Sequence, residues 1–223
     1  MTFESKLVPP VVVVLVVEHS DTCRDEVFEG LAAQDYENFQ VVVLHRGQSS
    51  IEERVRSAIP SALVKEVSDS NNFGEIANQI EKLTQGASFY LFLEDRTALA
   101  SDSLSLLVAE ALESNAGILG PKVLDWDDPS RITSMGLLVD AFGVETGFVE
   151  AGELDQQQHD RVREAFTVTG EAVLVRSDLF ETLGGFDPKI LGSEQYLDLC
   201  WRAQIAGGRI LVVPQATVRS RKE

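Results

Sequence analysis

Basic residues are scarce in this sequence, and their shortage excludes several classes of partner. Lys and Arg number 19 against 36 Asp and Glu among 223 residues, which gives a formal net charge of −17 at pH 7. Nucleic-acid binding depends on clustered Lys and Arg that displace counterions from phosphates, so we expect no nucleic-acid partner. The same acidity opposes unaided attraction to anionic lipid headgroups.

Cysteine and long apolar runs are also scarce. The two cysteines, Cys23 and Cys200, lack the spacing of a metal site, and we expect both to be buried free thiols. The longest strongly apolar run covers residues 7–17, well short of the roughly 20 residues that span a bilayer. It has neither a cationic leader before it nor a small-residue cleavage site after it. We therefore expect no transmembrane helix in this chain and a cytoplasmic location.

Periodic apolar residues in the first half predict an α/β fold. Val11–Val17 is an uninterrupted apolar run, nearly all valine, typical of a strand buried on both faces of a parallel sheet. The pattern predicts further strands at 39–44, 62–67, 89–93 and 117–123. It also predicts a helix that starts near residue 22 and helices at 73–83 and 101–113, with Leu112 among the core-facing residues of the last. This alternation indicates a doubly wound, mostly parallel sheet with helices on both faces over residues 9–122. A hydrophobic share of 44% over 223 residues favours one domain.

The second half begins with an acidic excursion at residues 125–160. Regular patterning then returns, with predicted strands at 166–175 and 209–213 and predicted helices at 177–183 and 195–206. The carboxylates and the histidine of the excursion admit a transition-metal site, but charge-rich loops are usually solvated and no spacing here fixes a coordination geometry. The residues concerned are Asp125, Asp127, Asp128, Glu153, Asp155, His159 and Asp160.

Several short motifs follow one another in a recognisable order. They are Q-D-Y-E-N-F at 34–39, N-F-G at 72–74 with A-N at 77–78, the strand and acidic turn at 89–95, G-G-F-D-P at 184–188 and D-L-C-W-R at 198–202. Together they resemble the inverting family-2 glycosyltransferases, which implies a single GT-A (Rossmann-like) domain over 1–223. A nucleotide-binding half at 9–122 and an acceptor-side half at 123–218 are then expected. Residues 120–129 and 152–160 further resemble a subset of large actinobacterial members in which a membrane portion follows the catalytic domain.

The resemblance implies transfer of sugar from a nucleotide-diphosphate sugar to a glycan or lipid-linked acceptor, in cell-envelope glycan assembly at the inner face of the membrane. A membrane-bound partner, or a membrane portion outside this chain, is then expected. Where the family usually has an acidic residue for the nucleobase, this chain has His45 and Arg46, and Arg46 is either a bidentate phosphate contact or a solvated loop residue. The expected nucleotide-sugar contacts are His19, His45, Arg46, Asn72, Gly74, Glu94 and Asp95.

The metal motif of the family is substituted. A D-x-D motif would place carboxylates at positions 94 and 96, but position 96 is Arg96. The family's C-terminal histidine, often a further ligand, falls at Ser220. Because magnesium and manganese prefer hard oxygen ligands, we expect no divalent cofactor to be required and assign no metal ligand.

The base motif is substituted as well, because its first carboxylate position holds Gln195, an amide that cannot accept a proton at neutral pH. Asp198 and Glu194 remain as candidates for the general base. Asp198 is alternatively a helix-start carboxylate that interacts with the helix dipole. The substitutions leave a second function open, a catalytically retired GT-A module that scaffolds or regulates an envelope-synthesis complex. A third possible function is that of an unrelated doubly wound binding domain, which would require the ordered motifs to be coincidental.

Overall fold

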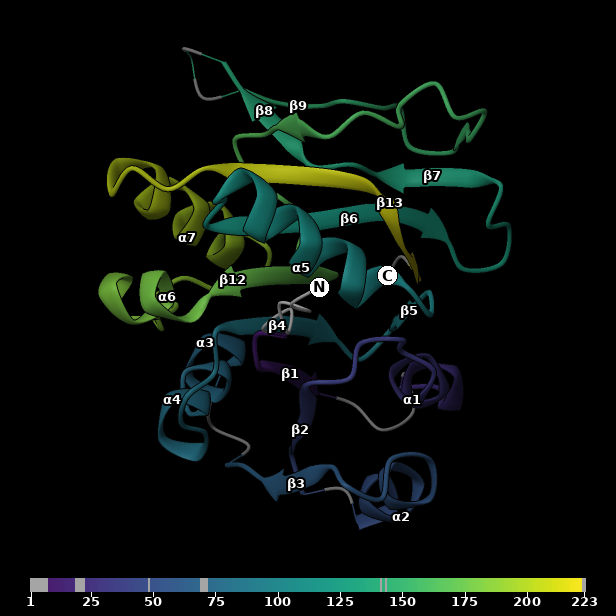
Figure 1. The fold of residues 1–223 in the computed structure, drawn as a ribbon, viewed down its shortest axis with the longest axis vertical. Helices are drawn as coiled ribbons and strands as arrows, with labels where there is room; N and C mark the ends of the chain where they lie inside the picture. Colours follow the sequence, from purple (N-terminus) through teal and green to yellow (C-terminus); the bar gives the residue numbers. More distant parts are fainter. Residues whose placement is uncertain are drawn as a thin grey trace, which may run out of the picture.

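The computed structural model describes residues 8–18, 23–47, 49–68, 72–140, 142 and 144–221, which form a mixed α/β fold (Figure 1). The strands are β1 (Val11–Val17), β2 (Phe39–His45), β3 (Leu63–Glu66), β4 (Phe89–Glu94), β5 (Thr97–Leu99), β6 (Ile118–Asp125), β7 (Arg131–Ser134), β8 (Leu137–Val139), β9 (Glu145–Gly147), β10 (Glu153–Leu154), β11 (Arg163–Glu164), β12 (Ala172–Arg176) and β13 (Ile210–Ser220). The helices are α1 (Asp25–Ala32), α2 (Ser49–Ala58), α3 (Phe73–Ala77), α4 (Ile80–Leu83), α5 (Ser103–Ser114), α6 (Ser177–Leu183) and α7 (Glu194–Ile205).

The predicted valine-rich strand, β1, lies inside an 11-stranded sheet whose main order is β10-β7-β6-β12-β4-β1-β2-β3. All seven of its side chains are buried, as a strand covered on both faces requires. β1 pairs in parallel with β2 on one side and with β4 on the other. The chain therefore builds the sheet outward from β1 to β3 and then returns to β4. Such a reversal is the switch point at which open α/β sheets bind ligands.

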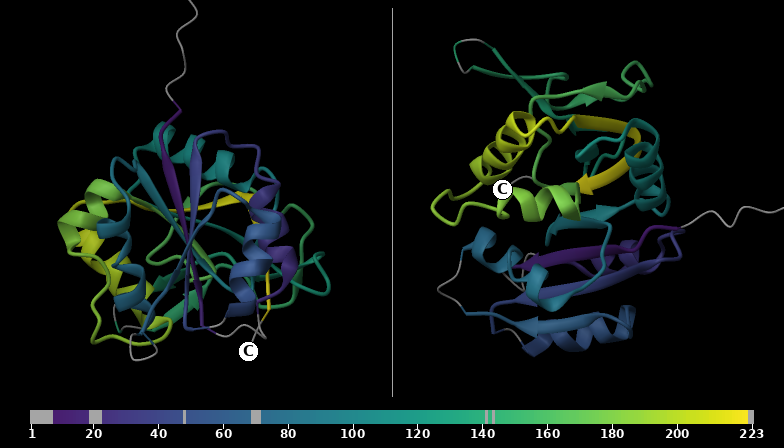
Figure 2. Two further views of the ribbon diagram at one scale, coloured as in Figure 1. Left: turned by 90° about the horizontal axis from the view of Figure 1, so that it is seen from below. Right: turned by 60° about the vertical axis from the view of Figure 1, so that its left-hand side comes forward.

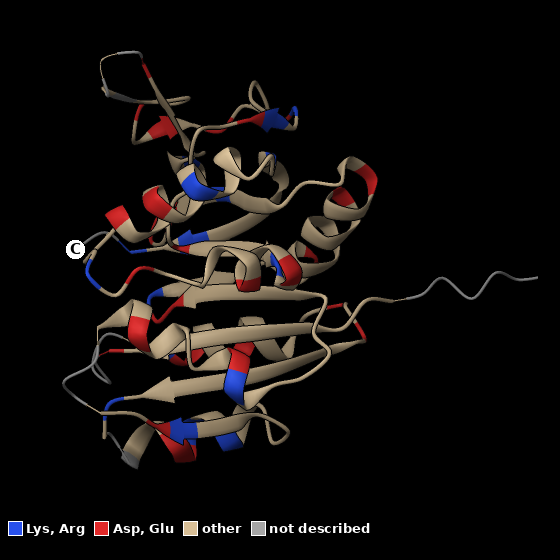
Figure 3. Ribbon diagram, turned by 90° about the vertical axis from the view of Figure 1, so that its left-hand side faces the viewer, with Lys and Arg blue, Asp and Glu red and all other residues tan. Residues whose placement is uncertain are grey.

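Helices cover both faces of the sheet (Figure 2). Successive β1 side chains point to opposite faces, so Val13 packs in the core beneath α1, α2 and α5, while Val14 packs in the core beneath α3, α6 and α7. The strands carry few charges, and Asp and Glu lie mainly on helices and loops (Figure 3). The predicted α/β class, with a mostly parallel core and helices on both faces, is confirmed.

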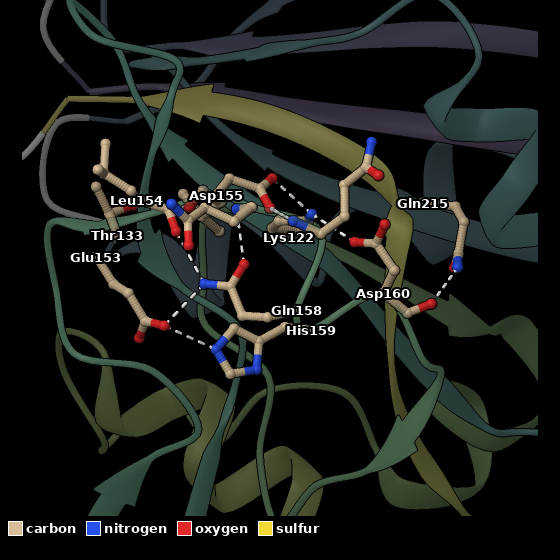
Figure 4. A network of polar contacts seen from close by, with 12 residues as sticks. Lys122, Thr133, Glu153, Leu154, Asp155, Gln158, His159, Asp160 and Gln215 are labelled. Atoms are coloured by element: carbon tan, nitrogen blue, oxygen red, sulfur yellow. Dashed lines mark hydrogen bonds and ion pairs between the residues drawn. The ribbon is translucent and has the colours of Figure 1, made fainter.

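The acidic excursion forms four short strands: β7 and β10 extend the edge of the main sheet, and β8 and β9 pair as a separate two-stranded sheet. Some of its acidic residues surround a buried lysine of β6, Lys122 (Figure 4). Lys122 Nζ donates to Asp155 Oδ2 at 2.7 Å and to Asp160 Oδ1 at 3.0 Å. His159 Nε2 lies 3.0 Å from Glu153 Oε1. The Asp125 carboxylate acts in a local turn, where it accepts from the backbone N–H of Asp127 and of Asp128. In the described ranges, no group of three or more His, Cys, Asp or Glu is placed to hold a metal ion.

Several predicted boundaries are wrong. The helix predicted over 73–83 is divided into α3 and α4, and the strand predicted over 166–175 is regular only from Ala172. The closing strand, predicted to end at Val213, continues through a register shift to Ser220. Leu112, predicted to face the core from the helix at 101–113, is 58% exposed, because the inward stripe of α5 continues through Ala111 instead.

The division into two halves, at 9–122 and 123–218, stays a prediction. The strand β12, from the second half, lies between β4 and β6 of the first half and pairs antiparallel with both. No helix among the described residues is long and apolar enough to cross a membrane.

Candidate functional site

A cleft opens at the carboxyl ends of β1, β2 and β4, at the switch point of the sheet. Its larger cavity has a volume of about 540 Å³. The side chains around it come from the ends of three strands and the starts of two helices, and the lining residues are Val16, Glu18, Arg46, Asn72, Phe73, Glu94, Asp95, Arg96, Leu191, Gly192, Ser193, Glu194, Gln195 and Tyr196.

A smaller cavity of about 300 Å³ adjoins the first one. It is lined on its far side by residues 167–171, which lead into β12, and by Leu197 of α7. Four residues line both cavities: Glu94, Arg96, Ser193 and Glu194. The cleft therefore has two compartments that meet at these residues.

Arg46 is held inside the larger cavity by an ion pair. Its Nη2 donates to Glu18 Oε1 at 2.9 Å, and the Arg46 side chain is 22% exposed. The backbone N–H of Glu18 in turn donates to Asp95 Oδ2 at 3.0 Å. This chain of contacts fixes the ends of β1, β2 and β4 against one another and presents one guanidinium to the cavity.

Glu94 is a half-buried carboxyl group beside a second one. Its backbone N–H donates to the carbonyl of Glu171 at 3.1 Å, which places the two residues side by side where β4 meets the start of β12. Burial, and then the nearby Glu171 carboxylate, raise the pKa of Glu94 to about 7, although Arg96 opposes the shift. Arg96 Nε lies 3.4 Å from Glu94 Oε2. Glu94 is therefore a carboxyl group that titrates near neutral pH.

Two of the first residues of α7 are buried polar side chains that line the larger cavity. Gln195 is 2% exposed and Tyr196 is 4% exposed. Neither Gln195 Oε1 nor the Tyr196 hydroxyl has a hydrogen-bond partner among the described residues. Burial, followed by the Glu94, Glu171 and Glu18 carboxylates, raises the pKa of Tyr196, so its hydroxyl keeps its proton.

Aromatic packing holds this part of α7 in place. The Tyr196 ring contacts Phe186 at 5.4 Å between centroids and Phe73 at 5.7 Å. Phe186 also packs edge-on against Phe92 of β4 at 5.0 Å. These contacts connect α3, α7 and the central sheet, since such pairs contribute beyond their burial.

The N-F-G and A-N motifs of α3 contact the G-G-F-D-P motif, more than 100 residues later in the chain. Asn78 Nδ2 donates to the Phe186 carbonyl at 2.8 Å, and Asn78 Oδ1 accepts from the Phe186 N–H at 2.9 Å. Gly185 has φ +73°, and a Cβ there would lie 2.4 Å from Asn78 Oδ1. Asn72 caps α3 through the Glu75 N–H at 3.0 Å. The motifs therefore position the cleft walls.

The structure brings together only part of the predicted contact set. Arg46, Asn72, Glu94 and Asp95 line the larger cavity. His45 is 4% exposed and lines neither of the two cavities. Gly74 is buried behind Gln195, whose Oε1 would lie 2.6 Å from a Cβ at that position, and His19 lies outside the described residues.

The two predicted bases have different positions. Glu194 is exposed and lines both cavities. Asp198 lines neither, and its Oδ2 accepts from Arg202 Nε at 2.8 Å, one turn along α7. Sequence reasoning missed Glu171 and Tyr196, whose positions depend on the antiparallel insertion of β12 beside β4. The one local signal was a glycine, Gly170, directly before the carboxylate.

Family comparison agrees with this geometry. A family model described as "Glycosyltransferase like family 2" matches residues 3–223. The chain belongs to this family. A search among curated proteins found no match.

Solved structures show the same GT-A fold as this family-2 domain. A structure of GalNAc-T7 with UDP, GalNAc and Mn²⁺ aligns over 96% of this chain and 44% of its own, with a TM-score of 0.70 and 11% identity. S. aureus TarS aligns over 96% and 37%, with a TM-score of 0.68 and 17% identity. TarS 1-349 in complex with UDP-GlcNAc aligns over 96% and 59%, with the same TM-score and identity. The chain thus spans between 37% and 59% of these chains, and at such identities the likeness shows the fold alone.

The residues at positions 96 and 220, where the sequence resemblance places the metal ligands of the family, do not fit a conventional divalent site. Arg96 brings a cation to a position where the D-x-D motif requires a carboxylate, and Asp95 accepts from the Glu18 N–H. Ser220, at the position of the family's histidine, lies across from Thr97 on β5, whose hydroxyl donates to Ser220 Oγ at 3.1 Å. Position 220 therefore lies next to the turn that follows the motif, but it offers only a hydroxyl that is already bonded.

Proposed function

We propose that this family-2 domain binds a nucleotide-diphosphate sugar in the larger cavity and transfers the sugar, with inversion, to an acceptor hydroxyl presented from the smaller cavity. The supporting observation is the pair of compartments that meet at Glu94, Arg96 and Glu194, at the switch point of the sheet. An in-line displacement requires the donor and the acceptor on opposite sides of one reacting carbon, and adjoining compartments provide such an arrangement.

Arg46 and Arg96 are the cations that we assign to the diphosphate. Both line the larger cavity, and a guanidinium can donate two parallel hydrogen bonds to phosphate oxygens. Arg96 occupies the place of a family metal ligand, where its fixed charge would stabilise the departing diphosphate. We therefore propose that neither manganese nor magnesium is required for binding.

Glu194 is our proposed general base. It lies where the two compartments meet, whereas Asp198 is paired with Arg202 outside both. The Glu194 carboxylate would take the acceptor proton as the acceptor oxygen attacks the anomeric carbon, and the bond to the diphosphate would break with its electron pair on the leaving oxygen.

For the biological setting we propose cell-envelope glycan assembly, with a glycan or lipid-linked acceptor at the cytoplasmic face of the membrane. The support is the resemblance of residues 120–129 and 152–160 to large actinobacterial members of the family. A membrane-bound partner, or a membrane portion outside this chain, would bring a lipid-linked acceptor to the cleft.

One observation favours the second candidate function, a catalytically retired module. The larger cavity holds more carboxylates than guanidiniums, which opposes a diphosphate when no divalent ion offsets the charge. The acidic groups are Glu18, Glu94, Asp95 and Glu194, and the basic groups are Arg46 and Arg96.

Binding and turnover together separate the two functions. Thermal-shift screening of nucleotide-diphosphate sugars should identify a ligand, and Arg46→Gln should weaken its binding by about tenfold or more, the loss of one charge-assisted contact. The control Arg56→Gln, on the exposed face of α2, should have no effect. Release of nucleotide diphosphate in the presence of acceptor mixtures then indicates a transferase. Binding without release indicates a retired module, and a screen with no ligand contradicts the proposal.

A further inference from the structure

Two neighbouring residues of α7 present polar atoms that the protein itself leaves without partners. Gln195 and Tyr196 are both more than nine-tenths buried, and both line the larger cavity. Gln195 Nε2 donates to the Gly192 carbonyl at 3.3 Å, so the amide directs its Oε1 elsewhere. Buried polar atoms without a partner cost roughly 1–3 kcal/mol each, so their retention calls for an explanation.

We propose that Gln195 and Tyr196 bind hydroxyl groups of an uncharged sugar, and so select the glycosyl group of the donor. Gln195 Oε1 accepts a hydrogen bond from one sugar hydroxyl, and the Tyr196 hydroxyl donates to another. The inference rests on the proposed function, because it assigns the sugar end of the nucleotide-diphosphate sugar. It places the diphosphate at Arg46 and Arg96 and the sugar against the start of α7.

The surroundings of Tyr196 determine the charge of the group that fits. Glu94, Glu171 and Glu18 are the carboxylates whose charges act on its hydroxyl. Burial, and then these carboxylates, raise the pKa of Tyr196 and keep its hydroxyl as a donor. The carboxylates also repel a carboxylate or phosphate placed beside the hydroxyl. A neutral polyol fits this place, whereas a uronic acid does not.

Room for the Tyr196 ring depends on Gly170. A Cβ at this position would lie 2.4 Å from Tyr196 Cε2 and 3.1 Å from Glu94 Oε1. On the other side, a Cβ at Gly74 would lie 2.6 Å from Gln195 Oε1. Two glycines therefore leave space for the Tyr196 ring and for the Gln195 amide.

The test compares sugar nucleotides with their parent nucleotides. Calorimetry on the purified chain would use UDP, UDP-glucose, UDP-glucuronate, GDP and GDP-mannose. Gln195→Met and Tyr196→Phe should each raise the Kd of the uncharged sugar nucleotide by about 5- to 20-fold, the loss of one hydrogen bond in a buried site. The Kd of the parent UDP or GDP should change by less than about twofold. Wild type should bind UDP-glucuronate at least about tenfold more weakly than UDP-glucose if uridine is the preferred base.

The unliganded variants provide a second readout. Each variant removes a buried polar atom without a partner, so the Tm of Tyr196→Phe should equal or exceed that of wild type. Gln195→Met also loses the 3.3 Å bond from Nε2 to the Gly192 carbonyl, and its Tm should fall by less than that of the control Tyr36→Phe. Tyr36→Phe is the matched control, since the Tyr36 hydroxyl donates to the Pro9 carbonyl at 2.6 Å and its loss should lower the Tm. Gln204→Met, on α7 outside the cleft, controls for substitution in this helix.

Four outcomes overturn the inference. They are equal weakening of sugar nucleotide and parent nucleotide, no weakening of either, a lowered Tm of Tyr196→Phe, and tight binding of UDP-glucuronate. In all four the parent nucleotide still binds, so the proposed function survives. If no nucleotide binds wild type, the proposed function fails and the sugar assignment fails with it.

Discussion

Replacement of Glu94 by glutamine should change how the stability of the protein depends on pH. Glu94 has a pKa raised from 4.5 to about 7, first by burial and then by the neighbouring Glu171 carboxylate. The native state therefore keeps this proton to a higher pH than the unfolded chain does. Its contribution to stability is fully present below about pH 4.5 and is lost as the pH rises through about 7. The glutamine of the variant does not titrate, so this loss disappears.

The size of the effect follows from the shift in pKa. A rise in pKa from 4.5 to about 7 corresponds to roughly 3 kcal/mol, at about 1.4 kcal/mol for each pKa unit. Between about pH 4.5 and 8.5, the free energy of unfolding of Glu94→Gln should therefore rise by roughly 3 kcal/mol relative to wild type. This shift already includes the opposing effect of Arg96, whose guanidinium lies 3.4 Å from the carboxylate and favours the charged form.

Urea denaturation of both proteins at several pH values measures this difference. The free energy of unfolding, extrapolated to zero denaturant, would be compared at each pH. Glu113→Gln serves as the control, since Glu113 lies exposed on α5, on the opposite face of the sheet from α7. Parallel pH profiles for wild type and Glu94→Gln would refute the reasoning, because Glu94 would then titrate alike in the folded and unfolded states.

Three other predictions concern the framework, the base and the metal position. Asn78→Ala removes the hydrogen bonds to both the backbone N–H and the carbonyl of Phe186, so it should lower the free energy of unfolding by about 2–4 kcal/mol, measured by urea denaturation. A loss under about 0.5 kcal/mol would contradict the assigned role. In an active enzyme, Glu194→Gln should reduce turnover by about 100-fold or more with little change in donor affinity, whereas Asp198→Asn should mainly lower stability. If Asp198→Asn lowered kcat and Glu194→Gln did not, Asp198 would be the base instead. Arg96→Asp combined with Ser220→His should create manganese binding that calorimetry detects, because two ligands are added and one repelling charge is removed. If the double variant folds but binds manganese no better than wild type, these positions are misaligned with the metal motif.

The fold was predictable because its main signals are local. The run Val11–Val17 is apolar at every position, and it forms the buried central strand that such a run indicates. The helix at 177–183 has the predicted bounds, because Gly184 in the left-handed conformation ends it. The buried face of helix α5 was harder to predict, because Leu112 and Ala111 both fit its apolar stripe and only tertiary packing selects between them.

The candidate site was predictable mainly where a residue ends or follows a strand, or where a motif marks the start of a helix, as Asn72 does for α3 and Glu194 for α7. Arg46, Glu94 and Asp95 follow β2 and β4 or end β4, and all three line the cavity. Glu171 was missed because its place beside Glu94 depends on the antiparallel pairing of β12 with β4, a long-range contact that no local pattern encodes. Asp198 shares its helix with Glu194, yet a one-turn displacement and the pairing with Arg202 place it outside the cleft.

The most direct test of the proposed function is a calorimetric titration of the purified chain with nucleotide-diphosphate sugars, with and without a metal chelator. We predict saturable binding of at least one uncharged sugar nucleotide, with an affinity that the chelator changes by less than about tenfold, or roughly 1.4 kcal/mol. Arg46 and Arg96 supply the positive charge in this proposal. Absence of binding across the panel, or a loss of more than about tenfold in affinity with the chelator, would contradict it.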